Sequence, residues 1–210
     1  LSSNLSKVSK NYYTLALDEL HIGNVDWNKA FRTGRLEIEE LVLNAPQIEV
    51  IQSSSPQADR TPTGDLNDFI RGKLASISIK ELAINGGSFL KKEKKDSLRN
   101  RIELDHLDFK MLGFHLGEAT QVGSDSFFYG TDASMKIKGG KVYLGDGIHV
   151  LAGEAIEVSS FKKILSATNL LLSPREKTLS DMRNTPIFDL KLAELSLENV
   201  DLKRLYQMGE

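Results

Sequence analysis

The chain of 210 residues contains no cysteine, which excludes disulfide bonds, thiolate metal sites and cysteine nucleophiles. It has no large excess of either charge, since the formal net charge is -2, and so it lacks the basic surplus typical of nucleic-acid-binding proteins. It has no apolar run long enough to cross a bilayer, and its polar first residues do not form a signal peptide. The balanced charge leads us to expect no nucleic-acid partner.

Motifs of catalytic sites are also missing from the sequence. There is no phosphate-binding loop, no Gly-x-Ser-x-Gly elbow and no Asp-rich calcium loop. No two of the histidines His21, His106, His115 and His149 stand at the spacing of helical metal ligands. His21 and His115 each stand between apolar neighbours, where a strand would direct them outward. We predict that the protein is not an enzyme and has no catalytic residue, no metal site and no cofactor.

What the chain does contain is an eight-residue repeat of the form apolar-x-apolar-x-x-Leu-x-apolar. Alternating apolar and polar residues are typical of a strand with one buried face. The many β-branched residues in these segments favour strand over helix as well. The five copies are residues 15–22, 36–43, 77–84, 102–109 and 190–197.

The repeat contains an odd step that a regular strand does not tolerate. Ile38 and Leu41 are three residues apart, so a regular strand would place them on opposite faces. A β-bulge at Glu39 and Glu40 would restore the face and bend the strand. A tight turn is the alternative, but the corresponding pairs contain neither Gly nor Asn, which two-residue hairpin turns require. We predict a recurring bulge.

A turn signal and a short apolar stretch follow each copy. We expect each unit to consist of a bent strand, a turn and a return strand, so that the units form an antiparallel meander. Gly139 with Gly140, and residues 145–147, predict two further turns. The signals after the five copies are Gly23 with Asn24, residues 44–47, residues 85–88, residues 111–113, and Glu198 with Asn199.

The predicted fold is mainly β, a curved antiparallel meander sheet that forms a roll or groove with recurrent β-bulges and two or three short helices. We expect residues 1–210 to form one repeat-containing domain, and we interpret it as a fragment of a longer chain because the repeat is still present near Glu210. Helix signals occur at residues 28–32 before Gly34, at residues 63–74, at residues 175–182 and from Leu202 onward.

The repeats direct many apolar side chains to one face, and few helices are available to cover it. A large exposed apolar surface usually marks a binding site, and an extended groove suits acyl chains. The alternative is a closed core packed against the protein's own loops. The candidate groove-lining residues are Leu15, Leu17, Leu20, Ile22, Leu36, Ile38, Leu41, Leu43, Ile77, Ile79, Leu82, Ile84, Ile102, Leu104, Leu107, Phe109, Leu190, Leu192, Leu195 and Leu197.

These repeats, with the polar segment and apolar stretch after each, resemble the AsmA-like family, which includes TamB-like proteins. The resemblance implies a long rolled β-sheet with an apolar interior, in the periplasm or cell envelope of a Gram-negative bacterium. It also implies an inner-membrane anchor outside this segment, and a role in lipid transport or outer-membrane assembly and integrity. Lipid or acyl chains and other envelope proteins are the partners it suggests. The family supplies no catalytic residues.

Three other interpretations remain open. A structural or protein-interaction β-repeat module would use the same sheet without lipid. A leucine-rich repeat needs a regular period of about 20–29 residues, whereas the repeated Leu stands at 20, 41, 82, 107 and 195. A hydrolytic β-domain would need paired acids, and no pair stands out.

The charged stretch 91–96 is either a site for anionic headgroups or a solvated loop tip.

Overall fold

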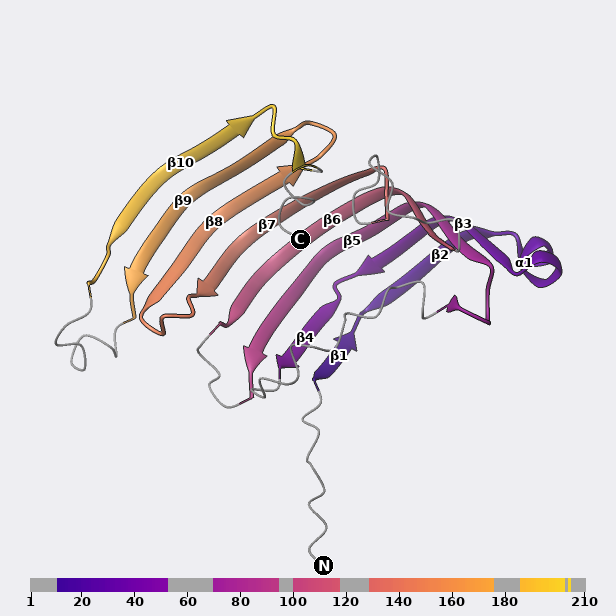
Figure 1. Cartoon of the computed structure of the whole chain (residues 1–210), viewed down its shortest axis with the longest axis horizontal. Helices are drawn as coiled ribbons and strands as arrows, with labels where there is room; N and C mark the ends of the chain where they lie inside the picture. The colour runs from indigo at the N-terminus through magenta and orange to yellow at the C-terminus, as the bar shows by residue number, and fades with distance from the viewer. Residues whose placement is uncertain are drawn as a thin grey trace, which may run out of the picture.

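The computed structural model describes residues 11–52, 70–94, 100–117, 129–175, 186–202 and 204. Their strands form one large arched sheet (Figure 1). The elements are β1 Tyr12–Ala16, β2 Glu19–Val25, α1 Trp27–Thr33, β3 Arg35–Asn44, β4 Gln47–Gln52, β5 Ser76–Glu93, β6 Ile102–Gly117, β7 Asp132–Tyr143, β8 His149–Ser159, β9 Ile164–Pro174 and β10 Leu190–Glu198.

The sheet combines a meander with two parallel pairings. From β5 to β10, strands that follow one another in sequence pair antiparallel, as predicted. In contrast, β3 runs parallel to the first half of β5, and β4 runs parallel to its second half. On the other side, β2 pairs with β3 and β1 pairs with β4. Thus β1–β2 and β3–β4 each behave as one long, interrupted strand.

The predicted class, a mainly β, curved sheet with recurrent irregularities, is confirmed. The sheet is open and mixed, because the pairings of β3 and β4 with β5 are parallel. Within the described residues, the main element contacts are those between neighbouring strands and that of α1 with β3. The described strands therefore form a single layer.

The predicted helix at residues 28–32 is confirmed as α1. The side chain of Asp26 accepts a hydrogen bond from the backbone N–H of Lys29, which caps the first turn. Gly34 adopts the left-handed conformation and donates its N–H to the carbonyl of Ala30, which ends the helix. Of the other helix signals, Ile70, Leu202 and Arg204 are helical, and Arg175 is not. The rest of 175–182 and much of 63–74 lie outside the described residues.

The predicted turn-and-return units are wrong. The supposed turns at 85–88, 111–113 and 139–140 lie inside the continuous strands β5, β6 and β7. Gly23 and Asn24 lie inside β2, and residues 45 and 46 merely separate β3 from β4. After Asn199 no return strand forms in residues 200–202. The turn at 145–147 is confirmed, because it joins β7 to β8.

The segments mistaken for turns are breaks in strand pairing. The pairing of β2 with β3 skips Asn24 and Glu39, and that of β3 with β5 skips Glu39 and Lys80. The register is the same on both sides of these breaks, because both strands are irregular at the same level. Corresponding breaks occur at Lys80/Gly113, Asp105/Gly139, Gly139/Glu154, Glu154/Asn169 and Asn169/Ala193. The bends therefore line up across neighbouring strands.

At several breaks a residue in the left-handed conformation faces a residue with a charged side chain. Asn24 has a φ of 51° and faces Glu39, and its Nδ2 donates a hydrogen bond to Oε2 of Glu39 at 2.6 Å. Asn169, with a φ of 49°, makes the same kind of hydrogen bond to Glu154. Asn tolerates this conformation better than most residues do. The breaks are thus encoded by side chains on both strands.

Three glycines show that the breaks keep apolar side chains on one face. A Cβ atom at Gly140 would lie 3.7 Å from Cγ2 of Ile137, and one at Gly153 would lie 3.6 Å from Cδ1 of Ile156. A Cβ atom at Gly87 would lie 3.0 Å from Cγ2 of Ile84. In a regular strand, positions three residues apart face opposite ways. Each break therefore restores the face, as the odd step in the repeat predicted.

We predict that Gly139→Ala destabilises the fold by about 2 kcal/mol. The residue has a φ of 74°, and an added Cβ would lie 2.7 Å from Oδ2 of Asp105 on the facing strand. Gly147→Ala is the matched control, because Gly147 has the same φ of 74° but nothing within 4 Å of the added atom. We expect about 1 kcal/mol there, from the backbone alone. Urea unfolding measures both, and equal losses would contradict the proposed close approach.

Candidate functional site

Cross-strand pairing arranges apolar residues in rows that cross the sheet, and residues directly opposite one another share a face. One row, here called the central row, crosses eight strands and is apolar throughout. Neighbouring strands are about 4.8 Å apart, so the row is roughly 34 Å long. The central row consists of Leu20, Leu43, Ile84, Phe109, Met135, Val158, Leu165 and Leu197. We call the face that carries it the inner face.

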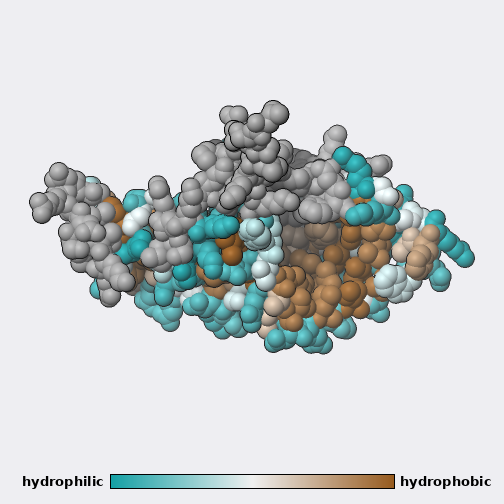
Figure 2. Space-filling view, turned by 90° about the horizontal axis from the view of Figure 1, so that it is seen from below, coloured by the Kyte–Doolittle hydropathy of each residue, from teal (hydrophilic) through white to brown (hydrophobic). Residues whose placement is uncertain are grey.

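The register places the candidate groove residues of the strands on this inner face; Leu17 lies between β1 and β2. The candidate residues in the middle of the sheet are half-buried or buried, for example Ile38, Ile79 and Leu107. Those near the two edges are open, since Leu20 is 51% and Leu190 is 61% exposed. Figure 2 shows apolar residues gathered in a hollow, with hydrophilic residues around them.

The candidate groove residues do not include the share of the inner face that β4, β7, β8 and β9 contribute. Met135, Val158 and Leu165 complete the central row, and Ile137 pairs with both Leu107 and Ile156. The sequence contains further copies of the eight-residue repeat, if Gly, Pro, Phe or Ile is allowed at its sixth position and Gly at its third. Such copies are residues 41–48, 82–89, 109–116, 135–142, 151–158 and 165–172.

The opposite, outer face carries charged residues that pair between strands. Lys110 lies 2.6 Å from Glu81, and Lys136 lies 3.8 Å from Glu157. A hydrogen bond from Lys162 is the main cause that lowers the pKa of Glu157. His21 and His115 lie on this face as expected, near Glu40 and Ser78 respectively. The two faces thus differ sharply in polarity.

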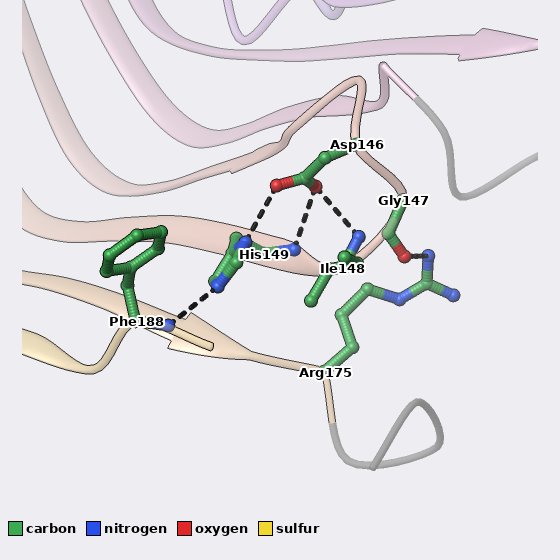
Figure 3. Close-up of polar contacts among 6 residues, drawn as sticks. All are labelled: Asp146, Gly147, Ile148, His149, Arg175 and Phe188. Atoms are coloured by element: carbon green, nitrogen blue, oxygen red, sulfur yellow. Dashed lines mark hydrogen bonds and ion pairs between the residues drawn. The ribbon is translucent and has the colours of Figure 1, made fainter. Parts of the chain in front are cut away.

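The polar cluster around the β7–β8 turn is centred on His149, which is only 4% exposed (Figure 3). Nδ1 of His149 lies 2.7 Å from Oδ2 of Asp146, and Nε2 accepts a hydrogen bond from the backbone N–H of Phe188 at 3.0 Å. Because Nε2 is the acceptor, the neutral ring carries its proton on Nδ1. Arg175 donates a hydrogen bond to the carbonyl of Gly147. The cluster ties the segment before β10 to the turn.

Asp146 organises this cluster. Oδ1 accepts hydrogen bonds from the backbone N–H groups of Ile148 and His149, while Oδ2 accepts from the His149 ring. The ring contact is the largest of the causes that lower the pKa of Asp146 from 3.8 to about 2. A lowered carboxyl pKa stabilises the fold at pH values above the ordinary pKa of the group. This stabilisation is lost as the pH falls through the lowered pKa. No nucleophile is hydrogen-bonded to His149 in the described cluster, so we interpret it as structural.

We predict that Asp146→Asn lowers stability at neutral pH by roughly 1–2 kcal/mol. The amide would either place an N–H group against the protonated Nδ1 or force the other tautomer, leaving the Phe188 N–H without its acceptor. Thermal melts of both proteins should converge as pH is lowered from about 4 to about 2, where the native Asp146 becomes protonated. A difference that is constant over this range would contradict the assigned role.

The described part of the chain offers neither a metal site nor a membrane-spanning helix. Among the described residues, no group of three or more His, Cys, Asp or Glu side chains is placed to hold a metal ion. No helix in this part of the chain has the length and apolar character needed to span a membrane. The inner face is therefore the main candidate site in the described structure.

Comparison of the chain with family models, with curated proteins and with solved structures finds no match.

Proposed function

We propose that the chain holds lipid acyl chains along its inner face, as a non-enzymatic part of a cell-envelope protein of the AsmA-like kind. The observation that carries the proposal is the central row, which is apolar on every strand it crosses. In the wider proposal, the protein lies in the periplasm, is anchored in the inner membrane, and takes part in lipid transport or outer-membrane integrity.

The shape and chemistry of the face suit hydrocarbon better than a polar substrate. The breaks are lined up across the strands, so the sheet bends about an axis that also crosses the strands. The resulting trough runs along the rows of apolar residues, and an extended acyl chain could lie beside them over roughly 34 Å. Covering exposed apolar surface contributes about 25 cal/mol per Å². Bound acyl chains would therefore stabilise the open edges near Leu20 and Leu190.

The proposal predicts that lipid crosslinks to one face only. Met135 and Lys136 are neighbours on β7 and lie on opposite faces, since Met135 belongs to the central row and Lys136 pairs with Glu157. We expect Met135→benzoylphenylalanine to crosslink to phospholipid on illumination, and Lys136→benzoylphenylalanine to give little or no product. Mass spectrometry of the purified adducts measures both.

The outcome separates the proposal from its rivals. Equal labelling at both positions would indicate nonspecific contact, and no lipid adduct at Met135 in a folded protein would contradict the proposal.

The edges of the sheet favour one alternative, a protein-interaction module without lipid. The strand β10 is exposed along most of its length and pairs only with β9 among the described strands. Protein adducts at Met135, without lipid adducts, would support that alternative.

A further inference from the structure

One charged side chain stands in the apolar row along a rim of the inner face. We call this row the rim row. Within it, Lys91 is the only charged residue. The rim row consists of Tyr13, Val50, Lys91, Ile102, Val142, Leu151, Leu172 and Leu190.

The lysines at the end of β5 differ in what they contact. Lys92 faces outward, and its Nζ lies 2.6 Å from Oε1 of Glu49. Lys94 places its Nζ 5.6 Å from the centre of the Tyr12 ring. The side chain of Lys91, a half-buried residue, makes no hydrogen bond or ion pair in the described structure. Of these three lysines, Lys91 is thus the one whose ammonium group has no partner in the described structure.

Nearby carboxylates do not neutralise Lys91 by direct contact. Glu93 lies two residues further along the same face, but its Oε1 accepts a hydrogen bond from Asn100 at 2.7 Å. Glu49 is paired with Lys92, and Glu103 with Arg101. The apolar neighbours of Lys91 in the rim row are Val50 and Ile102. A lysine stem can lie along such apolar surface while its charged end remains at the rim.

We infer that Lys91 binds the anionic headgroup of a lipid whose acyl chain lies on the inner face. The inference rests on the proposed function and adds a headgroup preference and an orientation to it. The acyl chain contacts the apolar rows, and the phosphate or carboxylate of the headgroup lies at the rim beside the ammonium of Lys91. Because a charged hydrogen bond there is partly shielded from water, the contact discriminates between headgroups of different charge.

The test compares two probes with the same acyl chain, lysophosphatidylglycerol and lysophosphatidylcholine, in binding titrations with the whole chain. We expect the native protein to prefer the anionic probe by on the order of tenfold, which corresponds to one charge-assisted hydrogen bond. Lys91→Gln should remove most of this preference, while Lys91→Arg should retain it. Lys92→Gln is the matched control, since it removes the same charge from the adjacent residue on the outer face. It should leave the preference unchanged.

Each outcome decides the inference. Loss of the preference in Lys91→Gln alone, with an unchanged circular dichroism spectrum, supports it. Equal effects of Lys91→Gln and Lys92→Gln, or no preference in the native protein, would overturn it while leaving acyl binding intact. Failure of both probes to bind would overturn the proposed function as well. Glycerol 3-phosphate serves as the chain-free probe, and competition at a concentration similar to that of the anionic lipid would show a phosphate site instead of a lipid site.

Discussion

The alignment of breaks at the same level in neighbouring strands is the constraint on which the rest of the structure depends. An extra residue in one strand alone would shift the register and turn every later side chain to the other face. At most breaks both partners are irregular together, as at Asn24 with Glu39 and at Glu154 with Asn169, so the register is kept. Between β5 and β6 the register shifts at Gly87 and is restored at Phe89. The bends then add up across the sheet, and apolar side chains on both sides of a break remain on the inner face.

This arrangement leaves an apolar face without a second layer in the described part of the chain. Most sheets cover such a face with helices or another sheet. Here α1 contacts β3, and the remaining element contacts are between neighbouring strands. The apolar residues near the edges, such as Leu20 and Leu190, are correspondingly exposed. A lipid would cover these exposed edges, which links the open sheet to the proposed function.

Much of this could be predicted from the sequence, because alternation and the odd step depend only on strand geometry. The face shared by Ile38 and Leu41, and the helix ended by Gly34, follow from local rules. The turns were mispredicted because Gly and Asn signal a positive φ, not the reversal of the chain. At Gly113 and Gly139 the facing strand continues through the break and keeps the strand extended. The parallel pairing of β3 with β5 and the charged cluster around His149 depend on contacts distant in sequence, which no local pattern contains.

The most direct test of the account uses the absence of cysteine, since each introduced thiol is unique. Single cysteines placed along β6 would be reacted with a charged thiol reagent, with and without phospholipid. Protection by lipid is predicted at the half-buried inner-face positions 104 and 109 and then, past the break at Gly113, at 114. Positions 108, 110, 112 and 115 should react equally under both conditions. Protection that alternates without interruption past Gly113, or lipid that protects neither set, would contradict it.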